Sequence, residues 1–136
     1  MYWLFKSEPS TWSWQDQCTA GNAEWDGVRN YQAQNYMRQM KMSELGFFYH
    51  SVTEKSIKGI VEITKLWYPD PSDTTGRFGM VDVKAMQSLV HCVTLAMIKA
   101  DKRLADIALV RQGRLSVMPL DAQAWRIICE MGGVKP

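Results

Sequence analysis

The middle third of the sequence predicts a series of β-strands, and no other feature constrains the fold as much. Residues 45–49 form a compact apolar run, and residues 57–68 form a longer one. The stretch "PDPSDTTG", Pro69–Gly76, consists of turn-forming residues. Residues 80–85 then alternate apolar and charged side chains, which is typical of a strand with one buried face. We therefore expect a sheet at the centre of the molecule.

Helices are predicted on both sides of this central region. Ser13 and Asp16 fit a capping box, and Gly21 provides a stop for the helix that they start. Asp121 is a good N-cap for the clearest helix, whose apolar side chains recur at helical spacing. The expected helices are Ser13–Cys18, Asn30–Met40, Thr94–Ala100 and Asp121–Met131.

Two further short strands complete the prediction. Tyr2–Phe5 is an aromatic-rich apolar run, and Leu115–Met118 is a strand candidate that Pro119 should stop. Strands and helices do not alternate regularly, which argues against a parallel, doubly wound sheet. The pattern favours an α+β fold, with a curved or barrel-like mixed sheet of five to six strands and flanking helices.

Length and composition indicate one globular domain over residues 1–136, with 46% hydrophobic and 22% charged residues. The net charge of +2 permits a local basic patch but does not indicate a strongly basic nucleic-acid-binding domain. Neither a signal peptide nor an apolar run of membrane-spanning length is apparent. The three cysteines, Cys18, Cys92 and Cys129, lack C-x-x-C spacing. They predict reduced, buried thiols in a cytoplasmic protein. We also expect the protein to be a monomer.

The usual catalytic signatures are missing. The sequence has no G-x-S-x-G elbow, P-loop, G-x-G-x-x-G or H-E-x-x-H motif. Its only histidines are His50 and His91, and no set of partners gives either one a metal-ligand pattern. We therefore expect neither metal nor cofactor. Lys6 with Glu8 could act as an acid–base pair, although a surface ion pair explains these residues more simply.

A binding site is the better supported expectation. "AEWDGVRNYQAQN" places Trp25 among polar residues before an Asp-Gly turn, where an aromatic side chain is poorly suited to a core. An ordinary polar turn would also explain this stretch. Most of the other tryptophans, Trp3, Trp12, Trp14, Trp67 and Trp125, are interpreted as packing residues. Candidate ligand-binding residues are Lys6, Ser7, Trp25, Arg29, Asn30, Tyr49 and Ser116, and candidate nucleic-acid-binding residues are Arg111 and Arg114.

Several blocks together resemble the EVE domain of the PUA-like superfamily, a family related to the YTH domains and to thymocyte nuclear protein. The blocks stand in the family's order: "YWLFKSEPSTWSWQD", "WDGVRNYQAQN", "FFYHS", "KGIVEI", "YPDPS", "MVDVKAM" and "LVRQGRLSVMPL". The resemblance covers Tyr2 to about Gly133 and implies an open PUA-like β-barrel with a pocket for one planar group. It also implies a non-catalytic reader of a modified base in DNA or RNA.

The resemblance assigns roles to individual residues. Lys6-Ser7 matches the "KS" after the first strand, and Trp25 matches the first wall of the YTH aromatic cage. Asn30 falls where the family places hydrogen-bonding groups, while Arg111 and Arg114 match a rim that would contact phosphates, a solvated loop being the alternative.

One departure concerns the loop after Asp70, which is shorter than is usual in the family. The second cage wall comes from this region, so Trp67, Tyr68 or Pro69 is expected to close the pocket.

Two other functions remain open. A small hydrolytic enzyme of the ASCH type would use Lys6 with Glu8 or Asp26, and a protein-interaction module would bind a small metabolite in its pocket.

Overall fold

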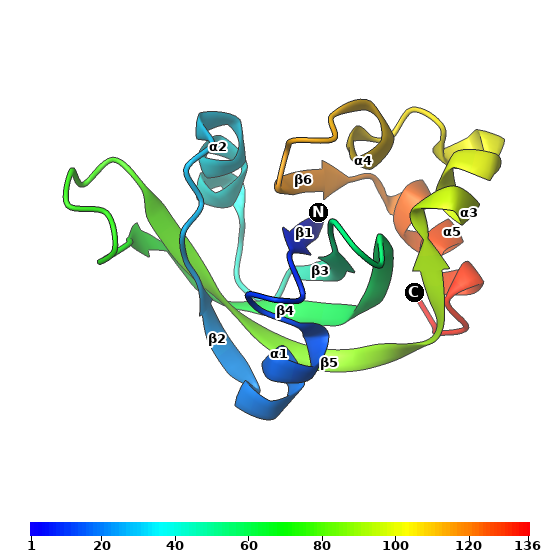
Figure 1. Cartoon of the computed structure of the whole chain (residues 1–136), viewed down its shortest axis with the longest axis horizontal. Coiled ribbons are helices and arrows are strands. Elements are labelled where there is room, and N and C mark those ends of the chain that lie inside the picture. Colours follow the sequence, from blue (N-terminus) through cyan, green and yellow to red (C-terminus); the bar gives the residue numbers. More distant parts are fainter.

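The computed structural model describes residues 1–136 and contains one six-stranded sheet with the order β2-β5-β4-β3-β1-β6. Figure 1 shows this sheet with helices around it. β1 and β3 are parallel neighbours, and the other neighbouring strands are antiparallel. The strands are β1 (Tyr2–Ser7), β2 (Asn22–Trp25), β3 (Leu45–His50), β4 (Ser56–Pro69), β5 (Gly79–Thr94) and β6 (Val117–Leu120).

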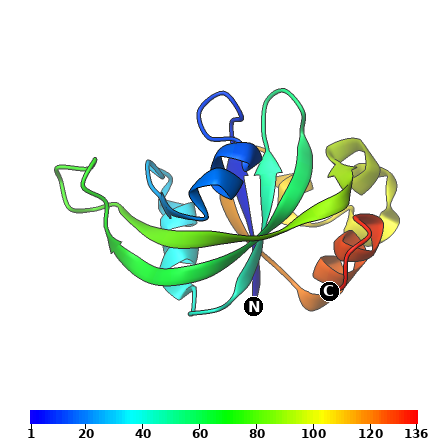
Figure 2. The same cartoon turned by 90° about the horizontal axis from the view of Figure 1, so that it is seen from below.

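The sheet is strongly curved. Figure 2 shows β4 and β5 as a long, bent ribbon, and irregularities in their pairing allow this bend. The curvature brings Trp25 of β2 against Phe5 of β1, with ring centres 5.2 Å apart, although three strands separate β1 from β2 in the sheet. The edge strands β2 and β6 do not pair, so the barrel stays open. The predicted α+β fold with an open, curved mixed sheet is confirmed.

Five α-helices and one 3₁₀ turn flank the sheet, and most begin at the capping residues expected from the sequence. Ser13 and Asp16 form the predicted capping box, and the side chains of Asn30, Thr94 and Asp121 also accept hydrogen bonds from the first helical turn. The helices are α1 (Trp14–Ala20), α2 (Tyr31–Gln39), α3 (Leu95–Ala100), α4 (Ala108–Arg111) and α5 (Ala122–Met131), with the 3₁₀ turn η1 at Lys102–Leu104. No helix is long and apolar enough to cross a membrane.

The structure corrects three local predictions. β5 continues well beyond residue 85, because alternation fades where both faces of the strand become exposed. β6 runs through Pro119 instead of stopping before it, since an edge strand tolerates a residue that lacks a backbone N–H. Cys18 and Cys92 are exposed, and only Cys129 is buried as expected.

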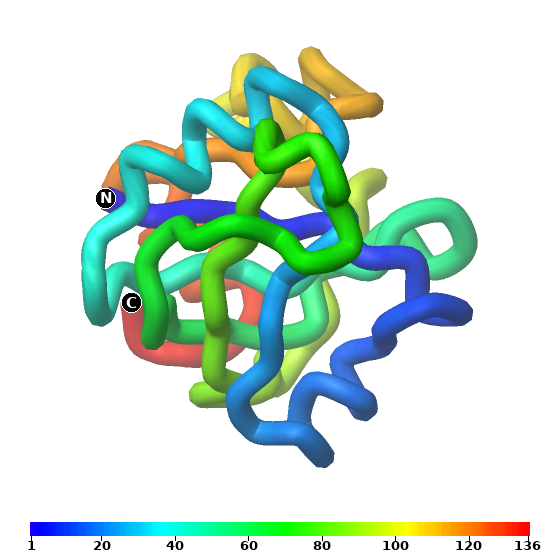
Figure 3. The backbone as a smooth tube through the Cα atoms, turned by 90° about the vertical axis from the view of Figure 1, so that its left-hand side faces the viewer, coloured from blue at the N-terminus to red at the C-terminus, as the bar shows by residue number.

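The core lies inside the curve of the sheet and is rich in aromatic side chains. Trp125 of α5 stacks between Phe47 at 4.0 Å and Tyr2 at 4.4 Å, measured between ring centres. This packing fixes α5 against the middle strands and leaves the other end of β1 free to form a site. Figure 3 shows β1 (dark blue) running through the middle of the molecule, with the loop before β5 (green) crossing in front of it.

Candidate nucleic-acid interface

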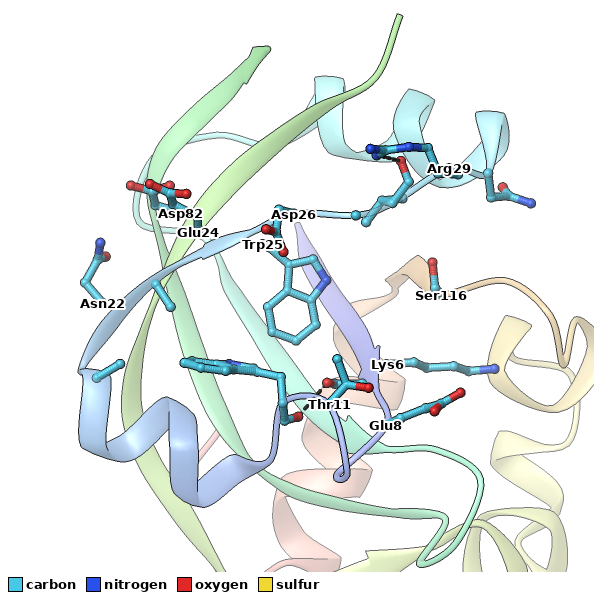
Figure 4. Close-up of a pocket in the computed structure, with 17 residues that line it drawn as sticks. Lys6, Glu8, Thr11, Asn22, Glu24, Trp25, Asp26, Arg29, Asp82 and Ser116 are labelled. Carbon is cyan, nitrogen blue, oxygen red and sulfur yellow. Dashed lines mark hydrogen bonds between the residues drawn. The ribbon is translucent and has the colours of Figure 1, made fainter. Parts of the chain in front are cut away.

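A pocket opens where β2 approaches the end of β1 without pairing to it. Its cavity measures about 950 Å³ and is lined by 17 residues. Most of them come from the end of β1 and the following loop, from β2 and the turn after it, and from Ser116 before β6 (Figure 4), while α1 contributes Ala20 and β5 contributes Asp82. The open barrel is thus the reason that this site exists, since a closed barrel would fill the gap with a strand pair.

The indole of Trp25 lies at the centre of this pocket (Figure 4). It is 7% exposed and packs edge-on against Phe5 and Phe48, with centroid distances of 5.2 and 5.4 Å. Trp25 is therefore both a core residue and a pocket wall, whereas the sequence predicted mainly the second role. A strand residue at an open barrel edge can pack on the core and line a pocket at the same time.

The indole nitrogen of Trp25 donates no hydrogen bond within the protein. Four other indole nitrogens donate to side-chain oxygens, those of Trp3, Trp12, Trp14 and Trp67, and that of Trp125 is enclosed in the core. Figure 4 shows the nitrogen-bearing edge of Trp25 turned toward Ser116. This donor is available to a ligand with an acceptor on its edge.

Trp12 supplies a second indole, which sequence reasoning assigned to packing. It lines the pocket, and its nitrogen donates to Oε1 of Gln17 at 3.0 Å. Trp12 precedes the N-cap of α1, a position whose apolar side chain usually packs on the fourth helical residue. That residue is the polar Gln17, and this mismatch was the available sign that Trp12 does not serve only as packing.

The end of β1 contributes Lys6 and Ser7, as predicted, but both side chains have internal partners. Lys6 Nζ donates to the carbonyl of Gly113 at 2.9 Å, and burial lowers the pKa of Lys6. Ser7 Oγ donates to the carbonyl of Trp12 at 2.5 Å. Ser7 can therefore only accept a hydrogen bond from a ligand, and Lys6 keeps two of its three donors.

The turn after β2 is held by a buried carboxylate. Asp70 is 2% exposed, and its Oδ2 accepts from the backbone N–H of Gly27 at 2.8 Å and from Nη1 of Arg29 at 3.3 Å. Its Oδ1 accepts from the N–H and the hydroxyl of Ser72. These hydrogen bonds outweigh the effect of burial and lower the pKa of Asp70 to about 2. Asp70 thus fixes the turn that carries Arg29 into the pocket.

Asn30 lines the pocket, but one of the two polar atoms of its side chain already has a partner in the protein. As N-cap of α2 it accepts the N–H of Ala33 at 2.9 Å through Oδ1. Its amide NH₂ has no internal partner and is the part that it can offer to a ligand. The sequence marked Asn30 as a ligand-binding candidate at the start of a helix, and the structure gives the capping role to its Oδ1 and leaves its NH₂ without a partner in the protein.

The expected closure by the loop after Asp70 does not occur through an aromatic residue. Trp67, Tyr68 and Pro69 do not line the pocket. Trp67 donates to Gln34 at 2.8 Å, and the hydroxyl of Tyr68 donates to Asp82 at 2.5 Å. Arg29, which is held by Asp70, lines the pocket in place of the expected aromatic residue.

Three other predicted residues lie outside the pocket. Tyr49 is 3% exposed beneath Lys6, whose Nζ is 6.0 Å from its ring centre, because the parallel register pairs these two residues. Burial raises the pKa of Tyr49. Arg111 and Arg114 are exposed around the segment that leads to Ser116, and Arg111 forms an ion pair with Asp106. The structure brings Ser116 to the pocket but not these three.

The residues of the hydrolytic alternative do meet in the pocket. Lys6, Glu8 and Asp26 all line it, yet neither carboxylate forms an ion pair with Lys6. No group of three or more His, Cys, Asp or Glu side chains is arranged to hold a metal ion.

Comparisons with known proteins give a consistent result. Thymocyte nuclear protein 1 of Danio rerio is 33% identical over 98% of this chain and 73% of its own length. A solved protein of Rhodopseudomonas palustris is 49% identical, with a TM-score of 0.92 over 97% of this chain and 92% of that one. Human thymocyte nuclear protein 1, solved in complex with DNA containing 5-methylcytosine, is 31% identical, with a TM-score of 0.89 over 99% of each chain.

An ASCH protein of Zymomonas mobilis is similar in fold alone, at 8% identity and a TM-score of 0.57 over 96% of this chain and 97% of that one. The family model for the EVE domain matches residues 1–131. This match covers almost the whole sequence, and the open, curved sheet is the one that the blocks described above imply. The chain belongs to the EVE-domain family.

Proposed function

We propose that this protein is a non-catalytic reader that binds one modified base of DNA in the pocket beside Trp25. The observation that carries the proposal is the meeting of two indoles with unused hydrogen-bonding groups in an open cavity of about 950 Å³. Support comes from the human relative, which was solved with DNA containing 5-methylcytosine.

The energetics of base flipping favour a pocket that combines aromatic side chains with hydrogen-bonding groups. A base that leaves the duplex costs a few kcal/mol, and stacking on an aromatic side chain returns about 1–3 kcal/mol. A buried methyl group adds only about 1 kcal/mol, so the polar groups must supply much of the discrimination between bases. The candidates are the indole N–H of Trp25, the amide NH₂ of Asn30 and the hydroxyl oxygen of Ser7.

Titration of one set of oligonucleotides tests this function. The strands carry cytosine or 5-methylcytosine at one position, in single-stranded and duplex DNA and in the matching RNA. We expect tighter binding of the modified DNA. Equal affinity for all modified and unmodified strands would contradict the proposal. Turnover of the bound strand by the same preparation would favour the hydrolytic alternative with Lys6, Glu8 and Asp26.

Arg111 and Arg114 are proposed to contact phosphates outside the pocket. The ion pair of Arg111 with Asp106 is exposed, so it costs little to exchange for a phosphate. Replacing both arginines with alanine should lower the salt dependence of binding by about one to two counterions. Binding of modified and unmodified strands should weaken equally, as measured by titration from low to high salt.

The matched control replaces Lys99 and Lys135, which are exposed cations outside the pocket. This double variant should keep the salt slope of the wild type. An unchanged slope in the arginine variant would remove Arg111 and Arg114 from the interface.

A further inference from the structure

An aromatic pair outside the core lies next to the pocket. Tyr31, the first residue of α2, is 61% exposed and is the one aromatic residue among the strongly exposed large hydrophobic side chains. Its ring centre is 5.2 Å from that of Phe78, and the two planes are tilted by 33°. Neither residue belongs to the hydrophobic core cluster. We call Tyr31 and Phe78 the aromatic ledge.

The ledge continues directly from the pocket. Arg29 and Asn30 line the pocket, and Tyr31 is the next residue in the chain. The guanidinium carbon of Arg29 lies 5.2 Å from the ring centre of Phe78. Arg29, Phe78 and Tyr31 therefore form a series of planar groups in which Tyr31 is the outer, open member.

The segment that carries Phe78 is stabilised by hydrogen bonds to Asp73. One carboxylate oxygen of Asp73 accepts from the backbone N–H groups of Arg77 at 3.0 Å and Phe78 at 2.8 Å. The other accepts from the hydroxyl and the N–H of Thr75. These bonds lower the pKa of Asp73 to about 2. A ledge ordered in advance loses little entropy when a ligand stacks on it.

Two arginines near the ledge are available to the phosphates of a strand. Arg38 lies over the ring of Trp67 at 4.4 Å and donates to the carbonyl of Arg77, but it has no carboxylate partner. The side chain of Arg77 is exposed and likewise forms no ion pair. The carboxylates of Asp70 and Asp73 are already occupied by the turn and loop that they hold.

We propose that the aromatic ledge stacks the nucleotide base next to the one in the pocket, so that the protein grips two positions of the same strand. This inference rests on the proposed function, because it places the strand by the base in the pocket. Stacking on an aromatic side chain is tolerant of sequence, since every base has a π-face. The ledge therefore adds affinity without adding preference for the modification.

The test uses Tyr31→Ala and Phe78→Ala with a single-stranded DNA oligonucleotide. It carries 5-methylcytosine or cytosine at one position and 2-aminopurine as the neighbouring base. Each variant should bind both strands about 5- to 100-fold more weakly, with the ratio of the two affinities unchanged. The fluorescence of 2-aminopurine should be quenched by the wild type and much less by Tyr31→Ala. Tyr31→Phe should behave as the wild type, because it keeps the ring.

Val90→Ala is the matched control, because it removes an apolar side chain that is 69% exposed and outside the pocket. It should leave both affinities and the fluorescence unchanged. Wild-type affinity and quenching in Tyr31→Ala would overturn the proposal, and so would a loss confined to the modified strand. Failure of the proposed reader function gives a different result, because the wild type would then bind the modified and unmodified strands equally. The effect of Tyr31→Ala on the affinity for each strand would still be measured.

Discussion

Trp25→Ala is expected to lose about 3–5 kcal/mol of unfolding free energy together with its selectivity for a modified base. The loss of stability follows from burial, because Trp25 is 7% exposed and packs on Phe5 and Phe48. The loss of selectivity follows from removal of the indole face and its unpartnered N–H. Chemical denaturation measures the first effect, and titration with modified and unmodified strands measures the second.

Trp25→Phe separates these two effects. Phenylalanine keeps most of the packing, so we expect a loss of stability of less than about 2 kcal/mol. It lacks the N–H donor and part of the stacking area, so affinity for the modified strand should fall about tenfold. The matched control is Trp125→Phe, a fully buried tryptophan that does not line the pocket. If both phenylalanine variants bound like the wild type, Trp25 would be only a core residue.

Asp70→Asn should lower the free energy of unfolding by about 2–4 kcal/mol and weaken binding of a base. The carboxylate of Asp70 accepts hydrogen bonds from Gly27, Arg29 and Ser72, and an asparagine would turn an NH₂ group toward some of these donors. The turn after β2 would lose its anchor, and Arg29 would no longer be held beside the pocket. Denaturant unfolding and oligonucleotide titration measure the two effects.

Asp70 also makes stability depend on pH in a predictable direction. Its pKa falls from 3.8 in the unfolded chain to about 2 in the folded protein. The stabilising contribution, about 2 kcal/mol, is therefore complete above pH 3.8 and is lost as the pH falls toward 2. Unfolding of the wild type and of Asp70→Asn, compared at each pH from 7 to 2, should show the difference shrinking over this range. A difference that stays constant with pH would contradict this role.

Four of the five α-helices could be predicted, because their signals are local, but α4, which has no side-chain cap, was not. Ser13, Asn30 and Asp121 are each followed by a sequence that can form the first turn, and each caps the expected helix. β2, with only four residues, was missed, whereas the other five strands were predicted from apolar runs and alternation. The order of the strands could not be predicted, because the parallel pair β1–β3 joins segments about forty residues apart and depends on packing of the whole core.

The candidate site was only partly predictable for the same reason. Trp25, Asn30 and Ser116 reach the pocket as expected, since each lies at the end of a strand or helix. Tyr49 lies one residue from the end of β3, but the parallel register places it beneath Lys6. Short-range patterns place a residue on an element, whereas the face that it presents to a cavity depends on strands paired far along the chain.

Because the pocket lies at an open sheet edge, the free energy needed to open it differs from the free energy of global unfolding. β2 has four residues and pairs only with β5, and such edges open locally at free energies below that of global unfolding. Opening of β2 would remove Trp25 from the pocket, because Trp25 is the last residue of this strand. If DNA binds in this pocket as proposed, it should hold β2 closed and slow the hydrogen exchange of the β2 amides that bond to β5, by a factor that grows with ligand concentration. The affinity for a ligand and the hydrogen-exchange rate of β2 therefore both depend on the equilibrium between the closed and the open form of this strand.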